Sequence, residues 1–370
     1  MYNINKIRNK ILLGDTLEEL KKFPPESIDC IVTSPPYWRL RDYRVEGQIG
    51  LEATLKEYIE KMLKITAELK RILKKTGVFF LNWGDCYGGN NRRAGLKNSR
   101  GCMNKKLIPA KCMTLQNYRI IIRMIDEQQW ILRNIVIWYK PNAMPSSVKD
   151  RFANKYEPVF MLVKSKKYWF DLGAVRIPHK TTIEEYRKKL PKSENNKTNF
   201  EAGAGIIKYS TNSAIKRRFT LGKNPGDVWQ IPIQPFPEAH FATFPERLVE
   251  PMIKAGCPQW ICKKCGKARE RITRTKYEVK SNSISRSIKE GKEKEVGLVA
   301  RNFTGNALHY TIGWTDCGCN AGWEQGIVLD PFMGAGTTAL VATKLNRDWI
   351  GIELNPEYIE IAYRRLNRER

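Results

Sequence analysis

The chain has 370 residues, of which 42% are hydrophobic, so it can bury the core of one large domain with insertions or of two domains. Its 65 Lys and Arg against 38 Asp and Glu give a net charge of +27. This predicts a polyanionic partner, because neutralised phosphates release condensed counterions. A host organism that favours lysine accounts for only part of the excess. No apolar stretch approaches a membrane span, and residues 1–10 lack the apolar core of a signal peptide, which predicts a cytoplasmic protein without a membrane partner.

The N-terminal part of the chain alternates short apolar runs with segments of helical spacing. In chain order, the predicted elements are strand 10–15, helix 16–23, strand 27–34, helix 54–75, strand 77–85, strand 130–140 and strand 156–165. Strands separated by helices favour an α/β fold with a parallel sheet.

The C-terminal part repeats this alternation. Residues 326–338 predict a strand, a tight loop and the start of a helix, and residues 348–354 predict the next strand. Asn355 then caps a last helix that reaches about Leu366, with Pro356 at its first position, where proline is favoured.

Three segments do not fit the sheet pattern and are expected to be insertions that carry substrate contacts. Residues 86–112 hold seven basic residues and no acidic one, among them Arg92, Arg93 and Arg100, which are candidates for DNA contacts. Residues 166–239 are polar and irregular, and residues 257–320 are rich in cysteine.

A glycine-containing loop near the C-terminus indicates a cofactor site. Gly334 and Gly336 follow a buried strand and precede a helix, where glycine lets the backbone approach a ligand. Glu353 lies at the end of the next strand, where an acid can accept hydrogen bonds from a ribose diol. Nothing basic follows Gly336, so the loop departs from phosphate-cradling loops. The pattern predicts an adenosine-containing cofactor.

The tetrapeptide Ser34-Pro35-Pro36-Tyr37 follows a buried strand and is the candidate catalytic motif. An exocyclic amino group of a base is a poor nucleophile, because its lone pair is delocalised into the ring. The Ser34 hydroxyl and the Pro35 carbonyl can accept its two hydrogens and free the lone pair for attack, while the prolines fix the backbone. Tyr37 offers a flat face for stacking on a base taken out of the duplex.

These motifs resemble those of a known family. DPFMGAGTT with GIELNPEY resembles the S-adenosylmethionine motif of amino DNA methyltransferases, and TSPPYW is similar to the catalytic signature of their N4-cytosine-specific members. The catalytic motif precedes the cofactor loop, as in the permuted β group of this family. The resemblance implies a circularly permuted Rossmann-like methyltransferase fold with insertions, built on a seven-stranded sheet with helices on both faces.

The resemblance also implies roles for particular residues. Asp15 is expected at the adenine of the cofactor, and residues 240–246, with Phe244 and Pro245, at its methionine end. Residues 138–157 are similar to the segment that walls the target-base pocket. The other expected cofactor contacts are Asp330, Pro331, Phe332, Gly334, Gly336, Thr337, Glu353 and Asn355.

The predicted organisation has five parts. They are a catalytic half at 1–165 with the basic loop 86–112, a target-recognition region at 166–239, a cofactor-closing segment at 240–256, a cysteine-rich insertion at 257–320 and a cofactor-binding half at 321–370.

The cysteines suggest a metal. The chain has nine, an odd and clumped set that fits reduced thiols or a metal better than a disulfide framework. Cys262, Cys265, Cys317 and Cys319 form two close pairs that could hold one structural zinc. Reduced cysteines in a turn-rich insertion are the alternative.

The sequence therefore predicts a site-specific enzyme that methylates N4 of cytosine in double-stranded DNA after base flipping. N6 of adenine is the alternative target. An RNA or protein-glutamine methyltransferase and a non-catalytic DNA-binding protein are less favoured. Carbon-5 methylation is a poor fit, because its cysteine nucleophile follows a proline and the chain has no Pro-Cys pair. Whether a restriction endonuclease acting on the same site is a partner stays open.

Overall fold

The computed structural model describes most of the chain and divides it into two units. The described residues are 1–88, 108–178, 200–201, 206–207, 222–234, 243–277 and 307–368. The first unit comprises Met1–Val175, Pro225–Arg269 and Cys317–Arg370, and the second comprises Arg176–Asn224 and Glu270–Asp316.

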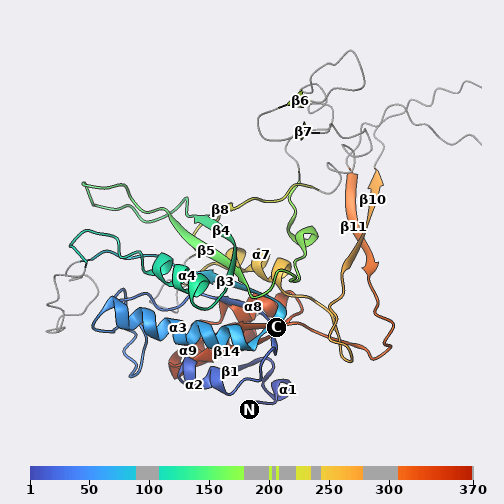
Figure 1. Cartoon of the computed structure of the whole chain (residues 1–370), viewed down its shortest axis with the longest axis horizontal. Coiled ribbons are helices and arrows are strands. Elements are labelled where there is room, and N and C mark those ends of the chain that lie inside the picture. The colour runs from blue at the N-terminus through green and yellow to red at the C-terminus, as the bar shows by residue number, and fades with distance from the viewer. Residues whose placement is uncertain are drawn as a thin grey trace, which may run out of the picture. The chain divides into compact units, whose positions relative to one another are not determined.

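A mixed sheet of eight described strands forms the centre of the first unit (Figure 1), in the order β1-β14-β13-β2-β3-β5-β4-β8. Their bounds are β1 (Lys10–Leu13), β14 (Asp348–Glu353), β13 (Ile327–Asp330), β2 (Ile28–Thr33), β3 (Leu73–Asn82), β5 (Tyr156–Val163), β4 (Ile131–Tyr139) and β8 (Val228–Gln230). The first strand of the chain thus pairs with its last strand.

The predicted α/β class is confirmed, with two corrections to the expected sheet. Neighbouring strands are parallel, but β5 runs antiparallel to both β3 and β4. Residues 140–155 join β4 to β5 without a helix, and such a connection returns the chain antiparallel. The sheet also has one strand more than expected, because the three-residue strand β8 pairs with β4.

Helices cover both faces of this sheet. One core contains side chains of α2 (Thr16–Lys21), α3 (Leu55–Ile72) and α4 (Gln116–Asp126), and the other contains side chains of α7 (Glu246–Gly256), α8 (Thr337–Lys344) and α9 (Pro356–Arg368). Successive side chains of a strand point to opposite faces of the sheet, so Phe79 of β3 packs into the first core and Phe80 into the second. Among the helices of the described ranges, none is long and apolar enough to cross a membrane.

Local sequence explains where two of these helices begin. Thr54 and Glu57 form a reciprocal capping box at the start of α3. Asn355 accepts a hydrogen bond from the amide of Glu357, and α9 begins at Pro356 as predicted.

The second unit contains four described strands. They are β6 (Phe200–Glu201), β7 (Ile206–Ile207), β10 (Arg271–Tyr277) and β11 (Ala307–Trp314). β10 and β11 pair antiparallel, and Arg271 holds β11 by a 2.6 Å hydrogen bond to Thr311 and by lying 4.7 Å from the centre of the Trp314 ring. The unit takes residues from two of the three expected insertions, 166–239 and 257–320.

Candidate active site

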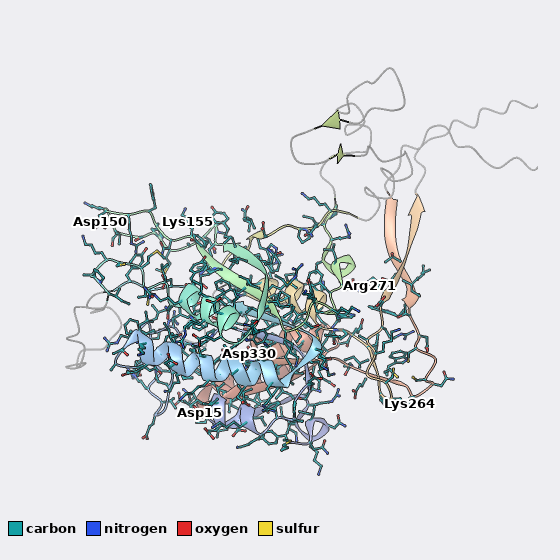
Figure 2. All side chains as sticks on the ribbon, in the orientation of Figure 1. Asp15, Asp150, Lys155, Lys264, Arg271 and Asp330 are labelled. Atoms are coloured by element: carbon teal, nitrogen blue, oxygen red, sulfur yellow. The ribbon has the colours of Figure 1, made fainter. Side chains whose placement is uncertain are left out.

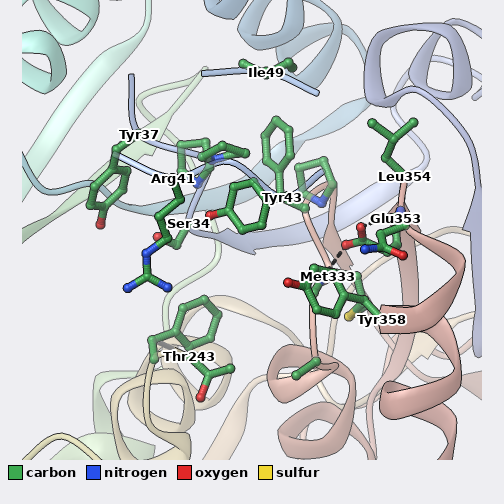
Figure 3. A pocket seen from close by; sticks show the side chains of 18 of the residues that line it. Ser34, Tyr37, Arg41, Tyr43, Ile49, Thr243, Met333, Glu353, Leu354 and Tyr358 are labelled. Atoms are coloured by element: carbon green, nitrogen blue, oxygen red, sulfur yellow. Dashed lines mark hydrogen bonds between the residues drawn. The ribbon is translucent and has the colours of Figure 1, made fainter. Parts of the chain in front are cut away.

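A cavity of about 620 Å³ opens at the carboxyl ends of the parallel strands of the first unit. This is the edge at which open α/β sheets bind their ligands. Ser34, Pro35, Pro36 and Tyr37 line it directly after β2. Residues at or just beyond the ends of β1, β13 and β14 line it as well: Asp15, Pro331, Phe332, Gly334, Thr337, Glu353 and Asn355. Figure 3 shows Ser34 and Tyr37 with Glu353 among the side chains of this cavity.

Pairing of β2 with β13 brings the two motifs together across nearly 300 residues of sequence. Cys30 lies opposite Val328 and Ile31 opposite Leu329, so both strands end at the same level. At that level the Thr33 hydroxyl donates a 2.6 Å hydrogen bond to the Asp330 carboxylate.

Asp330 anchors the cofactor loop from beneath. Its side chain is 1% exposed and does not line the cavity. It accepts hydrogen bonds from the hydroxyls of Thr33 and Thr338, each 2.6 Å long, and from the amide of Phe332 at 3.1 Å. Burial raises the pKa of Asp330 to about 6. The expectation that Asp330 contacts the cofactor is therefore corrected to a role in holding the loop.

The two glycines of the loop serve different needs. Both adopt positive φ, +51° at Gly334 and +77° at Gly336. A Cβ on Gly334 would meet none of the described atoms within 4 Å, so its backbone is open to a ligand. A Cβ on Gly336 would lie 2.9 Å from the Cβ of Ala362, and Gly336 does not line the cavity. Gly336 thus permits close packing against α9.

Glu353 is held in place by backbone amides. Its carboxylate accepts a 2.7 Å hydrogen bond from the amide of Gly334 and a 2.8 Å hydrogen bond from that of Asn355. Burial raises the pKa of Glu353 against these bonds, which lower it. The rings of Tyr43 and Tyr358, 6.4 Å apart and edge to face, line the same cavity. An acid beside aromatic rings is suited to bind a ribose and its base.

The candidate catalytic tetrapeptide is fixed by contacts from α3 and β5. The Pro36 carbonyl accepts a 2.6 Å hydrogen bond from the Tyr58 hydroxyl. The Tyr37 hydroxyl donates a 3.1 Å hydrogen bond to Glu157, which also accepts one from Lys140. Burial and the charge of Glu157 raise the pKa of Tyr37 well above its ordinary value, so the phenol stays neutral.

Comparison with known proteins now decides the family. The sequence model described as DNA methylase matches residues 28–259 and 320–364. The Type II methyltransferase M.XycI of Xanthomonas campestris pv. cyanopsidis is 33% identical over 95% of this chain and 86% of its own length. M.Cfr9I of Citrobacter freundii, also a Type II methyltransferase, is 30% identical over 96% and 87%. This chain belongs to the DNA methylase family.

A solved structure agrees with the fold of this DNA methylase. The PvuII DNA methyltransferase, described as cytosine-N4-specific, is similar with a TM-score of 0.53 and 20% identity, over 96% of this chain and 84% of that one. Membership of the family makes the chain an amino-directed DNA methyltransferase that uses S-adenosylmethionine as methyl donor. The open backbone at Gly334, the acid at Glu353 and the volume of the cavity fit this cofactor.

The structure describes only part of the segment 240–246, which was expected at the methionine end of the cofactor. Thr243 and Phe244 of the DNA methylase line the cavity, whereas Pro245 caps α7 and does not line it. Residues 240–242 lie outside the described residues. Thr337 lines the cavity and its hydroxyl accepts a 2.8 Å hydrogen bond from Arg365.

Sequence reasoning missed part of the cavity wall. Residues of the stretch 40–49, among them Tyr43 and Ile49, line it, as does Tyr358 of α9. The only signal in the sequence is the position of this stretch directly after the catalytic motif. Trp138, Lys140 and Glu157, which belong to the segment expected at the target base, also line the cavity.

The expected DNA contacts Arg92, Arg93 and Arg100 lie outside the described residues. Both ends of their segment touch the loop between β4 and β5. Lys111 forms a 2.6 Å ion pair with Asp150, and Arg151 lies 4.2 Å from the centre of the Tyr87 ring.

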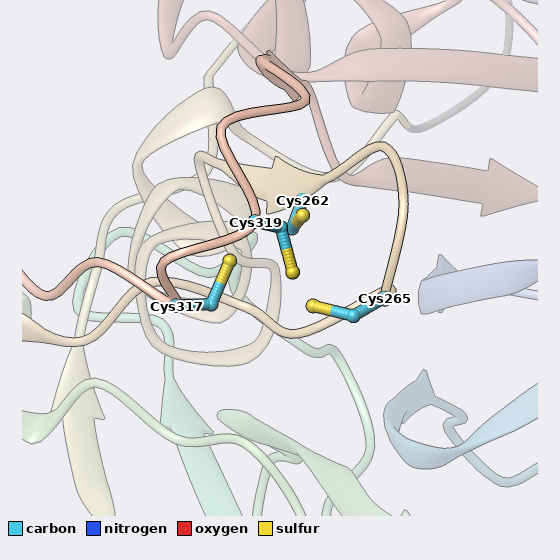
Figure 4. Close-up of side chains that lie close together, drawn as sticks. All are labelled: Cys262, Cys265, Cys317 and Cys319. Carbon is cyan, nitrogen blue, oxygen red and sulfur yellow. The ribbon is translucent and has the colours of Figure 1, made fainter.

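The structure brings the four paired cysteines together (Figure 4). The sulfur atoms of Cys262, Cys265, Cys317 and Cys319 all lie within 4.8 Å of one another. Cys257, their neighbour in sequence, is buried in the second hydrophobic core instead. Residues 260–319, which contain the four, fall outside the match to the DNA methylase family.

Proposed function

We propose that this DNA methylase transfers a methyl group to N4 of cytosine at a specific site in double-stranded DNA. One observation carries the proposal: Ser34 and Pro35 line the same cavity as Glu353 and the open backbone of Gly334. A base amino group and the methyl donor can therefore meet in one place. The serine in Ser-Pro-Pro-Tyr-Trp, typical of N4-cytosine enzymes, supports cytosine over adenine.

The residues of the cavity supply what the reaction requires. Bound S-adenosylmethionine presents an electrophilic methyl group on its sulfonium. The Ser34 hydroxyl and the Pro35 carbonyl accept the two amino hydrogens and leave the nitrogen lone pair free for in-line attack. After transfer the nitrogen is cationic and acidic, so its proton needs no strong base.

The target base must leave the duplex to reach this cavity. Tyr37 offers a ring on which the base can stack, and the ring is steadied by the bond to Glu157. Lys140, directly after β4, and Glu157 of β5 line the cavity, and the loop between these two strands carries exposed apolar side chains. Phe152 is 97% exposed and Met144 is 84% exposed. Apolar side chains of this kind can wedge between base pairs.

Charge supports a duplex as the substrate. The chain carries a net charge of +27, and the expected DNA contacts Arg92, Arg93 and Arg100 belong to a segment without acidic residues. We assign target recognition to residues 166–239. Relatives with the name Type II methyltransferase support a further proposal, that a restriction endonuclease recognising the same sequence is a partner.

Mass spectrometry of nucleosides tests the proposal. Duplex DNA incubated with the enzyme and S-adenosylmethionine should yield N4-methylcytosine, and a variant with Ser34→Ala should yield little. N6-methyladenine as the sole product would overturn the choice of base and keep the reaction class. Methylation of RNA or of protein glutamine, with duplex DNA unmodified, would overturn the choice of substrate.

A further inference from the structure

Four thiols of the first unit converge on one point. Cys262 ends β9 (Ile261–Cys262), Cys265 follows in the next turn, and Cys317 and Cys319 precede β12 (Trp323–Glu324). All four thiols are free, and their sulfur atoms point toward a common centre (Figure 4). Two pairs more than fifty residues apart in the sequence thus form one cluster.

Packing alone does not account for this cluster. Buried cysteines can act as small apolar side chains, but only Cys262 is buried here. Cys265 is exposed, and Cys317 and Cys319 are half-exposed. Apolar burial gives little reason to gather side chains at a surface, whereas a shared ligand does.

We propose that Cys262, Cys265, Cys317 and Cys319 bind one structural zinc ion. Zinc–sulfur bonds of about 2.3 Å in a tetrahedron place the sulfur atoms roughly 3.8 Å apart. The upper limit of 4.8 Å for all pairs is compatible with this tetrahedron. Four protein ligands leave no open position for water or substrate, so the ion has no part in the methyl transfer.

The backbone of both loops suits such a site. Gly266 follows the first pair and Gly318 separates the second, with φ of +68° and +72°, which allow tight turns around an ion. The amide of Gly266 donates a 2.9 Å hydrogen bond to the carbonyl of Cys262, which closes the first turn. Four thiolates with one Zn²⁺ carry a net charge of −2. Lys263 and Lys264 lie between the first two cysteines and Lys267 follows them, and their positive charges offset it.

The ion would reinforce a short strand pairing in the first unit. β9 and β12 pair over only two residues each. The guanidinium of Arg269 lies 4.5 Å from the centre of the Trp323 ring. Arg269 is also the last residue of the first unit before the chain enters the second unit at Glu270. The chain returns to the first unit at Cys317. Zinc would therefore clamp the two points at which the chain leaves and re-enters the first unit.

This region leads directly into the cofactor strand. Glu324 forms a 2.8 Å ion pair with Arg8, which also pairs with Asp348 at 2.7 Å. Gly326 donates a 3.2 Å hydrogen bond to the carbonyl of Pro258, and β13 begins at the next residue. Loss of zinc should therefore loosen 258–270 and 316–326 first, since they lie nearest the site.

Metal content tests the proposal without reference to activity. Protein purified under reducing conditions should contain about one zinc per chain by elemental mass spectrometry. Cys265→Ser and Cys317→Ser should each lose most of it, whereas Cys112→Ser, at an exposed cysteine outside the cluster, should keep it. Should the cluster variants fail to fold, mercurial modification of the wild-type thiols should release one zinc to a colorimetric chelator.

A second measurement locates the effect. Chelation should increase hydrogen exchange and proteolysis at 258–270 and 316–326, and added zinc should reverse the change. Three outcomes would each overturn the proposal. The protein could contain no zinc while its four cysteines react as free thiols, it could contain iron in place of zinc, or the four cysteines could form disulfides. None of these outcomes bears on the proposed methylation, because the base product is measured separately.

Discussion

The hydroxyl of Tyr37 donates a 3.1 Å hydrogen bond to the carboxylate of Glu157, which joins the catalytic tetrapeptide to β5. Glu157 also pairs with Lys140, whose ammonium lies 4.3 Å from the centre of the Trp138 ring. The tyrosine ring is thereby held by a strand other than the one it follows. Its proposed function, stacking on the extrahelical base, can be separated from this bond.

Two substitutions at Tyr37 should differ in effect. Tyr37→Phe removes the hydroxyl and keeps the ring, and methylation of duplex DNA should fall less than tenfold. Tyr37→Ala removes the stacking face and should cost about 1–3 kcal/mol, the usual value of a base–aromatic stack. Steady-state kinetics and the fluorescence of 2-aminopurine at the target position measure both. Equal losses in the two variants would argue that the hydroxyl, not the ring, matters.

Ser34→Ala should impair turnover far more than cofactor binding. Its hydroxyl contact matters chiefly in the transition state, so kcat should fall by roughly two orders of magnitude, as for other single transition-state contacts. Single-turnover methylation and calorimetry with S-adenosylmethionine give the two quantities. Ser165→Ala, just beyond the end of β5, is the control and should retain activity. A Ser34→Ala enzyme with normal turnover would remove serine from the mechanism.

Glu353→Ala should weaken binding of S-adenosylmethionine by about 1–3 kcal/mol, the value of charge-assisted hydrogen bonds. The substitution also frees the amides of Gly334 and Asn355, which the carboxylate holds at 2.7 and 2.8 Å. Glu357→Ala, at an exposed acid in the first turn of α9, is the matched control and should bind normally. Titration calorimetry with S-adenosylmethionine on the folded variants measures both affinities. Unchanged affinity in Glu353→Ala would refute the assignment.

Asp330 should make stability depend on pH in an unusual direction. Its pKa is about 6 in the folded protein against 3.8 for an unperturbed carboxyl, so between these values the folded state holds the extra proton. The free energy of unfolding should therefore fall as pH rises through this window. The two-unit difference corresponds to about 3 kcal/mol at 1.36 kcal/mol per unit.

Comparison with Asp330→Asn isolates this effect. The amide cannot ionise, so the stability of the wild type relative to the variant should decline from pH 4 to pH 7 in urea titrations. A constant difference between wild type and Asp330→Asn across this range would mean that folding does not raise the pKa of Asp330.

Arg92, Arg93 and Arg100 should contribute to DNA affinity through phosphates. Replacing all three with glutamine should weaken binding and flatten its dependence on salt, because each phosphate contact adds to that slope. The control is a triple variant in which the exposed residues Lys56, Lys64 and Lys75 are replaced with glutamine, because it loses the same net charge. The DNA affinity of each variant, measured from low to physiological salt, gives the slope that distinguishes the two variants. An identical slope in the two triple variants would show only a loss of overall charge.

Short-range patterns in the sequence were sufficient to locate the motifs. A proline-rich turn after a buried strand, a glycine turn before a helix and Pro356 after Asn355 depend on neighbouring residues, and the structure has each where it was predicted. The two cysteine pairs could be found for the same reason, since each is a short spacing. Composition likewise indicated a large core and a polyanionic partner.

Contacts between distant parts of the chain decided the rest. The sequence could not predict that β5 runs antiparallel or that β1 pairs with β14, because strand order depends on which pairings bury the most apolar surface. The same holds for Asp330, which turned out to lie beneath the loop, since only packing against Thr33 and Thr338 places it there. The meeting of the cysteine pairs, separated by about fifty residues, is also a product of the fold. Chemistry-bearing residue types are thus readable from local patterns, whereas their distances and burial follow from tertiary packing.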